Sequence, residues 1–391
     1  MYDIILFENF HAAFHHKYDV HLIARLLKSK GVKVAILNVY GEDKQENYPG
    51  IELLNLPFKE RIPDDTAWME CKGCVIKRLF YVIRFLVQQH YYMKKVRSFV
   101  EDKATSFYIG SYHLLMPSEF MSLNKTCLYW GLRSYRMTGF WQTFKNNPFL
   151  AFRMVWLKNV FLRNNYQQLF VSNEIIKREF LEIGIPENRL LIREERCIEY
   201  EKIFNPENKD KFFSLLVIGG LRRQKHVEKT IKTFKTSSLD DAVLRIVGEN
   251  TDEAYERVII DEMSGSYQIE RINRRLQYDE FNAFIERSHF TVFADEKQKS
   301  SVTNGTMMES IINFTPIIAP DHEPYTYYVE KYGLGLIYKY GDDVSFAEVI
   351  KKAQQIGYES FIKNIIKFQK TIEFDNVASQ LYESLMKTDQ R

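Results

Sequence analysis

Residues 214–234 read SLLVIGGLRRQKHVEKTIKTF, and this stretch decides the fold of the chain. Its apolar run, residues 215–218, has the length and composition of a buried parallel strand. Gly219 and Gly220 follow, where the backbone can turn tightly and a ligand can approach without meeting a Cβ atom. From residue 227 onward, apolar side chains recur at helical spacing. The stretch therefore predicts a buried strand, a glycine turn and an amphipathic helix.

Three cations stand in this turn: Arg222, Arg223 and Lys225. A helix start offers free N–H groups and the positive end of a dipole, so the cations and the helix together predict an anion site. The alternative is an ordinary strand-to-helix turn with a solvated basic helix start. The turn is neither a Walker loop nor a G-x-G-x-x-G fingerprint, which argues against most kinases, ATPases and nicotinamide-dependent enzymes.

The chain has 391 residues, which is enough for two domains of ordinary size. Strand and helix patterns alternate from residues 2–7 onward and restart at 215–218, after the polar segment NPENKD at 205–210. We therefore predict an α/β protein with two Rossmann-like, doubly wound parallel sheets, in domains at 1–205 and 206–372. Ligands bind beyond the carboxyl ends of such strands, so we expect the two domains to face a cleft that holds the site.

A second group of polar residues lies at 300–310, SSVTNGTMMES. Asn304, Gly305 and Thr306 form a turn that can cap a helix, and Glu309 follows one turn into that helix. Glu309 is either a surface glutamate that suits the helix dipole or a carboxylate that accepts two hydroxyls of a ribose. The spacing alone does not decide between these two interpretations.

The second half of the chain resembles the donor domain of GT-B glycosyltransferases of family 4, the group 1 type. The family's Gly-Arg, short turn, Lys-Gly and helix are similar to GGLRRQKH at 219–226, and its next strand ends in a glycine, as IVG does at 246–248. Glu309 matches the second residue of the family's Glu-x7-Glu motif, and FTPIIA at 314–319 follows it. Residues 373–391 are similar to the family's closing helix, which crosses back to the first domain. The first half of the chain resembles the family only in outline.

The sequence departs from the family pattern at three places. Gly220 occupies the position of the family's arginine, and Ser301 that of the first glutamate, which in the family contacts the donor sugar. Residues 8–16 replace the glycine-rich loop that usually follows the first strand.

The resemblance implies transfer of a sugar from a nucleotide diphosphate sugar to an acceptor hydroxyl, with retention at the anomeric carbon. Lys225, aided by Arg222 or Arg223, is expected to stabilise the leaving diphosphate. The other donor-binding residues expected from the family are Gly219, Gly220, Arg275 at the base pocket, Ser301, Asn304, Gly305, Thr306 and Glu309 at the ribose. His113 is the best match to a family histidine at the cleft, with His11 and His15 as rivals, although a lone histidine is more often structural.

We expect no cofactor and no metal, only the nucleotide sugar as co-substrate. The sequence contains no Asp-x-Asp, the pattern of metal-bound GT-A enzymes, and the protein supplies its own cations.

Two basic stretches, 71–100 and 120–173, contain no acidic residue. Basic amphipathic helices with aromatic residues, expected within 71–100 and 149–163, suit an anionic membrane surface. A solvated basic face is the plainer alternative, and nucleic acid is disfavoured because no recognition motif accompanies the charge. Without an evident signal peptide or spanning segment, the expected location is the cytoplasm, peripheral at the inner face of the plasma membrane.

The leading hypothesis is thus a retaining glycosyltransferase that builds a bacterial surface glycan on a lipid-linked acceptor. A catalytically silent GT-B-like subunit that binds a nucleotide is the alternative suggested by Ser301. A nucleotide-sugar epimerase of the same architecture is a third possibility.

Overall fold

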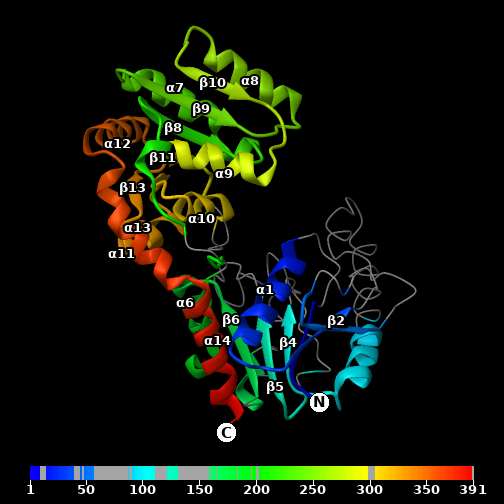
Figure 1. Cartoon of the computed structure of the whole chain (residues 1–391). Coiled ribbons are helices and arrows are strands. Elements are labelled where there is room, and N and C mark those ends of the chain that lie inside the picture. Colours follow the sequence, from blue (N-terminus) through cyan, green and yellow to red (C-terminus); the bar gives the residue numbers. More distant parts are fainter. Residues whose placement is uncertain are drawn as a thin grey trace. The chain divides into compact units, whose positions relative to one another are not determined.

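The computed structural model of the chain (Figure 1) divides into two compact units, each with its own parallel sheet. Unit 1 comprises Met1–Glu194 and Phe374–Arg391, and unit 2 comprises Glu195–Glu373. The structure describes residues 1–8, 15–38, 45, 48–56, 87, 90–110, 120, 122–130, 158–159, 161–164, 166–182, 184–194, 196–199, 202–297 and 304–389.

The described residues of unit 1 form a seven-stranded parallel sheet in the order β3-β2-β1-β4-β5-β6-β7. Its strands are β1 (Tyr2–Glu8), β2 (Val34–Asn38), β3 (Glu52–Asn55), β4 (Ala104–Gly110), β5 (Thr126–Trp130), β6 (Gln167–Val171) and β7 (Leu190–Ile192). The order reverses between β1 and β4, as in a doubly wound fold.

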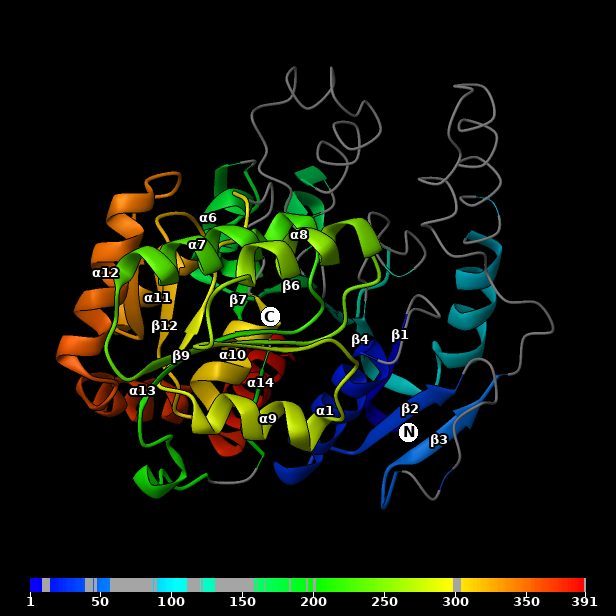
Figure 2. The ribbon, with the colours of Figure 1, turned by 90° about the horizontal axis from the view of Figure 1, so that it is seen from above.

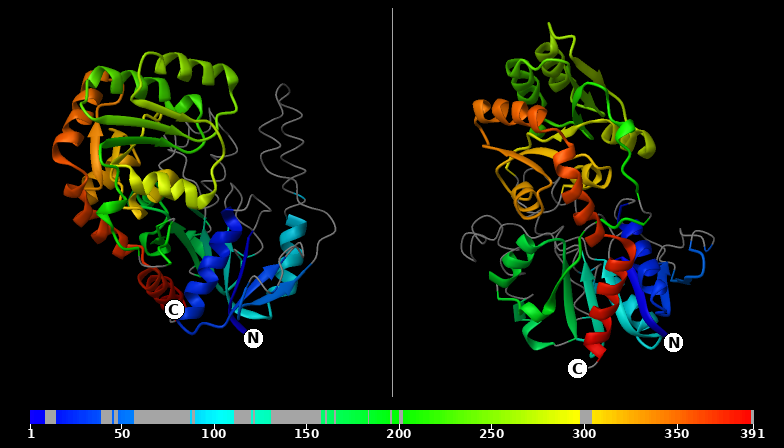
Figure 3. Two further views of the ribbon diagram at one scale, coloured as in Figure 1. Left: turned by 45° about the horizontal axis from the view of Figure 1, so that its top comes forward. Right: turned by 60° about the vertical axis from the view of Figure 1, so that its left-hand side comes forward.

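Helices α1 (His15–Ser29) and α6 (Glu174–Glu182), the 3₁₀ turn η3 (Glu187–Arg189) and the C-terminal helix α14 (Phe374–Asp389) complete the labelled elements of unit 1. Helix α14 packs against α1 (Figure 2) and lies beside the sheet of the same unit (Figure 3). The guanidinium of Arg25 in α1 lies 5.8 Å from the ring centroid of Phe374, so a cation–π contact joins the two helices.

Unit 2 has a six-stranded parallel sheet in the order β10-β9-β8-β11-β12-β13. The strands are β8 (Phe213–Ile218), β9 (Ala242–Val247), β10 (Ile269–Ile272), β11 (Phe290–Val292), β12 (Ile317–Pro320) and β13 (Gly335–Tyr338). This is the Rossmann strand order, in which β8 and β11 flank the point where the chain reverses direction across the sheet. The two predicted doubly wound α/β halves are thereby confirmed.

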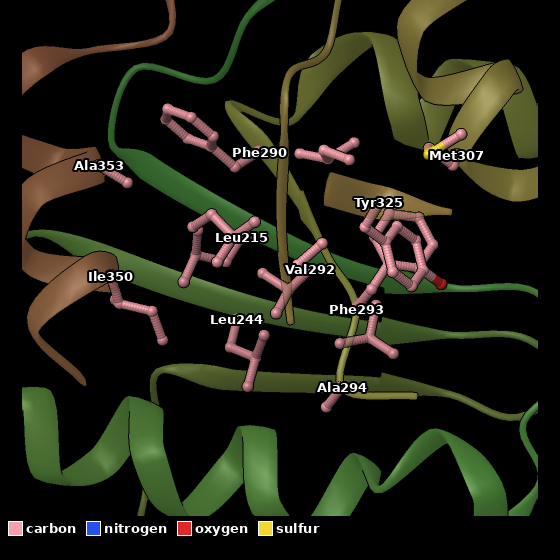
Figure 4. Packing of buried hydrophobic residues seen from close by; sticks show 14 of the residues in the cluster. Leu215, Leu244, Phe290, Val292, Phe293, Ala294, Met307, Tyr325, Ile350 and Ala353 are labelled. Atoms are coloured by element: carbon pink, nitrogen blue, oxygen red, sulfur yellow. The ribbon is translucent and has the colours of Figure 1, made fainter. Parts of the chain in front are cut away.

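The helical elements of unit 2 are η4 (Pro206–Asn208), η5 (Arg223–Lys225), α7 (Val227–Ser237), α8 (Glu253–Met263), α9 (Tyr278–Arg287), α10 (Gly305–Ile312), α11 (Tyr325–Tyr332), α12 (Asp343–Ile356) and α13 (Glu359–Thr371). Strand β8 is apolar on both faces because both are covered. Leu215 packs in a large cluster with side chains of β9, β11 and α12 (Figure 4), whereas Leu216 packs against residues of α9. This double coverage explains the continuous apolar run in the sequence.

Two features differ from the sequence-based predictions. Strand β3 was not predicted, because its two end residues are exposed and the other two are only partly buried, which leaves a weak apolar pattern. The predicted boundary at residue 205 also lies too far along the chain. Ile198 and Phe204 already pack in the core of unit 2, and the polar segment after them forms η4 inside that unit.

Candidate functional site

The glycine turn after β8 lies at the reversal point of the unit 2 sheet. Gly219 adopts a φ of +107°, a conformation that favours glycine. A Cβ atom at Gly219 would lie 3.3 Å from Lys225 Nζ and 3.4 Å from Thr306 Oγ1. The turn therefore brings together the end of β8, the ammonium group of Lys225 and the first turn of α10.

A second glycine holds this turn in place from the neighbouring loop. Gly248 follows β9 with a φ of +130°, and a Cβ atom there would lie 2.0 Å from the carbonyl oxygen of Gly219. The Gly219 N–H donates to Val247 O at 3.1 Å, and the Leu221 N–H donates to Glu249 O at 2.9 Å. The glycine of the predicted 246–248 pattern thus serves close packing of two loop backbones.

Lys225 is half-buried at the end of η5, and its Nζ donates to Ile218 O at 3.3 Å. Burial lowers the pKa of Lys225, and the charge of Arg222 adds to this effect, while the carboxylate of Asp295 opposes it. The turn is also tied to the loop after β11, since the Glu296 N–H donates to Gln224 O at 2.8 Å. Lys225 is therefore a positioned cation that has lost part of its hydration.

The two arginines of the turn have different surroundings. Arg223 Nε donates to Asp252 Oδ2 at 2.7 Å, and its guanidinium lies 5.3 Å from the centroid of the Tyr255 ring. Asp252 also raises the pKa of Arg223 through this hydrogen bond. Arg222 is exposed. Of the three predicted cations, Lys225 is the one that the structure places beside Gly219.

Asn304 fixes the start of α10. Its Oδ1 accepts hydrogen bonds from the N–H groups of Thr306 at 2.9 Å and Met307 at 3.2 Å. Its Nδ2 donates to Asp295 Oδ2 at 3.2 Å and to Tyr325 Oη at 2.8 Å. Tyr325 in turn donates to Asp295, and burial together with Asp295 raises the pKa of Tyr325. Every side-chain polar atom of Asn304 is thus used to hold the helix end.

This arrangement decides which backbone amides at the start of α10 are free to meet a ligand. The Thr306 N–H is taken by the Asn304 cap, so it is not available to a ligand. Within the described part of the chain, the Gly305 N–H has no acceptor. Gly305 and the Thr306 hydroxyl are therefore the groups that the helix end presents.

Glu309 lies one turn into α10 and is only 5% exposed. Its Oε2 accepts a hydrogen bond from the Tyr278 hydroxyl at 3.2 Å, and Arg196 Nη2 lies 3.5 Å from its Oε1. Burial and the Glu309 charge raise the pKa of Tyr278. Glu309 is consequently not the solvated surface glutamate of the plainer interpretation.

Sequence reasoning missed three side chains of this site: Arg196, Tyr278 and Asp295. They come from the entry segment of unit 2, the start of α9 and the loop after β11, and no local motif marks them. Asp295 follows a buried strand end, which is the one signal that could have singled it out.

For the remaining predicted site residues, the described part of the structure gives no contact with the groups described above. Gly220 is exposed, and within the described residues a Cβ atom there would meet nothing within 4 Å. Arg275 is exposed on the loop between β10 and α9. Ser301, His113 and His11 lie outside the described residues, and His15 begins α1.

Comparison with known families bears on this geometry. Residues 199–368 match the family model described as glycosyl transferases group 1. The match therefore shows the group 1 type for unit 2 alone. The match covers the glycine turn, Lys225, Asn304 and Glu309, so the site described above lies within the matched region of the chain. No curated protein sequence matches the chain.

Solved structures with the GT-B fold extend the likeness to both units of the chain. The Anabaena protein HepE in complex with UDP and glucose is 10% identical, with a TM-score of 0.62 over 98% of this chain and 99% of that one. The lipopolysaccharide outer core galactosyltransferase WaaB is 11% identical, with a TM-score of 0.66 over 98% and 99%. A trehalose-6-phosphate synthase, solved in a study of glycosyl transfer with retention, is 10% identical, with a TM-score of 0.67 over 98% and 99%. At these identities the likeness establishes the fold.

Two further observations concern only the described residues of the chain. None of their helices is long and apolar enough to cross a membrane. Their His, Cys, Asp and Glu side chains form no group of three or more that could hold a metal ion.

Proposed function

We propose that this glycosyltransferase moves a sugar from a nucleotide diphosphate sugar to an acceptor hydroxyl with retention at the anomeric carbon. The observation that carries the proposal is that Lys225 Nζ and Thr306 Oγ1 lie close to the Cβ position of Gly219, at the reversal point of the unit 2 sheet. A backbone without a Cβ atom, a cation and a helix start converge there, and together they suit a diphosphate. The complex of HepE with UDP and glucose and the synthase studied for glycosyl transfer with retention support the donor class and the stereochemistry.

In this proposal the protein stabilises the leaving group. The bond between the anomeric carbon and the diphosphate oxygen breaks, the acceptor oxygen bonds to that carbon on the same face, and the acceptor proton leaves with the nucleoside diphosphate. Charge builds up on the diphosphate as the bond breaks. Lys225 and the start of α10 are fixed before the reaction, so they stabilise this charge without reorganising.

The nucleoside end of the donor is assigned to the other side of α10. Glu309 accepts the ribose hydroxyls in place of, or together with, the Tyr278 hydroxyl, and Arg275 on the loop before α9 contacts the base. Ser301 stays a predicted contact of the donor sugar, with Arg222 a supporting cation and His113 a candidate group on the acceptor side. We propose that the protein needs no metal, because its own cations meet the phosphates.

The proposed acceptor is a lipid-linked glycan of a bacterial surface polysaccharide. WaaB, a lipopolysaccharide galactosyltransferase, has the same fold, which supports an acceptor of this kind. The basic stretches 71–100 and 149–163 support docking on an anionic membrane from the cytoplasmic side. Most of their residues lie outside the described part of the chain, although residues 90–100 are helical.

A donor screen tests the proposal. The purified chain is incubated with UDP-, GDP- and other nucleotide sugars, and slow donor hydrolysis is followed by release of the nucleoside diphosphate. We expect one class of donor to be hydrolysed, with the sugar released in the anomeric configuration of the donor. Binding of a nucleoside diphosphate without turnover of any donor would indicate a silent subunit and overturn the proposal.

A further inference from the structure

Two described residues of the segment that leads into unit 2, Arg196 and Lys202, place one cation at each end of α10. Arg196 Nη2 would lie 3.7 Å from a Cβ atom at Gly305, the first residue of α10. Six residues later, Lys202 Nζ donates to the side-chain Oδ1 of Asn313, the C-cap of the same helix, at 2.6 Å. Between the two, Ile198 anchors the segment, because its N–H donates to Ile372 O at 2.8 Å and its side chain packs in the core.

The helix dipole affects these two cations in opposite ways. The C-terminal end of a helix is its negative end, so Lys202 is stabilised where it lies. The N-terminal end is positive, so Arg196 is opposed by the dipole at Gly305. Glu309 offsets part of this cost, but its Oε1 lies 3.5 Å from Arg196, and within the described residues Arg196 makes no hydrogen bond. A guanidinium has five N–H donors, so most of its hydrogen-bonding capacity is left for a ligand.

The same region lacks a cation that the family pattern would supply. Gly220 stands where the family has its arginine, and the Arg223 side chain is engaged by Asp252. Arg196 lies beside Gly305, and Lys225 lies beside Gly219. Thr306, the residue after Gly305, also lies close to Gly219. Two cations therefore flank the start of α10.

We propose that Arg196 is the second cation of the diphosphate site and takes over the role of the arginine missing at position 220. This inference rests on the proposed nucleotide-sugar donor. Because Arg196 also contacts Glu309, the proposed ribose acceptor, it meets the phosphate next to the ribose. Lys225, on the far side at Gly219, meets the phosphate that carries the sugar. Each phosphate thus has its own cation.

A ligand series separates this role from a purely structural one. Affinities for the nucleoside diphosphate selected by the donor screen, UDP or GDP, are compared with those for its monophosphate and its nucleoside. For Arg196→Met we expect the diphosphate and the monophosphate to bind at least about tenfold more weakly, with nucleoside binding unchanged. For Lys225→Met we expect a similar loss for the diphosphate alone. Lys202→Met, which removes a cation from the same segment at the other end of α10, should leave the three affinities unchanged.

Several outcomes would overturn the inference. If Arg196→Met weakens nucleoside binding by the same factor as monophosphate binding, Arg196 only positions Glu309. Unchanged affinities in a folded Arg196→Met variant would exclude a phosphate contact. Absence of binding of any nucleotide by the wild-type chain would instead refute the proposed function, which keeps the two failures distinct.

A rescue variant tests whether Arg196 takes over the role of the arginine that is missing at position 220. Gly220 has an ordinary φ and open space at its Cβ position among the described residues, so Gly220→Arg can be accommodated. In the Arg196→Met background, we expect Gly220→Arg to restore most of the diphosphate affinity, and Lys202→Met/Gly220→Arg serves as the control. A folded double variant without recovery would refute the claim that Arg196 replaces the missing arginine.

Discussion

Lys225 is the residue on which the proposed chemistry depends most directly. Its ammonium group is partly buried and lies beside Gly219. A hydrogen bond to a charged group contributes about 1.5–3 kcal/mol. We therefore expect Lys225→Met to lower donor turnover by roughly one to two orders of magnitude. Initial rates at saturating donor check this, with the exposed Arg257→Met as the matched charge control. Turnover and diphosphate affinity both equal to those of the wild type would contradict the role.

Glu309 is expected to recognise the ribose through its two carboxylate oxygens. Glu309→Gln keeps the shape of the side chain but replaces one acceptor by a donor. We expect the affinity for UDP or GDP to fall about tenfold, and that for the 2′-deoxy analogue to change much less. Calorimetric titration of both ligands measures the difference. An equal loss for both would mean that Glu309 acts through Tyr278 and α10 and does not contact the ribose hydroxyls.

Lys209 gives unit 2 a pH-dependent stability that is independent of the site. It is buried, and its Nζ donates to Ser288 O at 2.7 Å and to Thr315 Oγ1 at 2.9 Å. Burial lowers the pKa of Lys209 to about 7. The unfolded chain therefore binds the extra proton between pH 7 and about 10.4, so the free energy of unfolding rises with pH across this window, by up to about 5 kcal/mol.

Urea unfolding at pH 7, 8 and 9 tests this pH dependence. Lys209→Met should flatten the rise, and Lys211→Met, at a nearby exposed position, should leave it intact. A wild-type stability that falls between pH 7 and 9, or a rise that persists in Lys209→Met, would contradict the assignment.

At the scale of elements, the start of α10 is the part of the site held by the most side-chain contacts. Asn304→Ala removes the helix cap and also one of the donors to the buried Asp295. We expect a loss of about 2 kcal/mol in the free energy of unfolding. Asn205 caps η4 with the same chemistry at an exposed position, so Asn205→Ala should cost about 1 kcal/mol or less. Equal losses in the two variants would mean that the contacts of Asn304 with Asp295 and Tyr325 add nothing.

The elements that could be predicted from the sequence are those that a local pattern of residues encodes. The strands around Leu215 and Ile317 were predictable because both faces are covered and the apolar runs are continuous. The cap at Asn304 and the glycine turn at Gly219 follow from turn chemistry. Arg196 and Tyr278 were not predictable, because their place beside Glu309 depends on tertiary packing of segments far apart in the chain.

For the whole molecule, the restart of the strand–helix alternation was enough to predict two Rossmann-like units. It misplaced the first boundary, since Ile198 and Phe204 join the core of unit 2 before the polar segment begins. Two predicted candidates of the first unit, His113 and His11, lie outside the described residues, and His15 begins α1. Their roles stay predictions.

The membrane proposal also belongs to the whole molecule. Anionic vesicles should bind the chain at low salt and release it as salt is raised, because each cation near the surface contributes only about 1 kcal/mol and the field is screened. Sedimentation with phosphatidylserine or phosphatidylglycerol vesicles measures this, and neutral phosphatidylcholine vesicles are the control. Arg153→Glu with Lys158→Glu should weaken binding. Equal binding to neutral vesicles, or none to anionic ones at low salt, would argue for a merely solvated basic face.

The backbone links between the loops after β8 and β9 have a thermodynamic consequence for ligand binding. Gly219 and Leu221 donate to Val247 and Glu249, and the space beside Gly248 leaves no room for a side chain. The turn cannot open without breaking main-chain pairs that continue the sheet. In the proposed function, a donor meets a turn that is already ordered, and little conformational entropy is lost there when it binds. That saving leaves more of the interaction energy at Gly219 to appear as affinity.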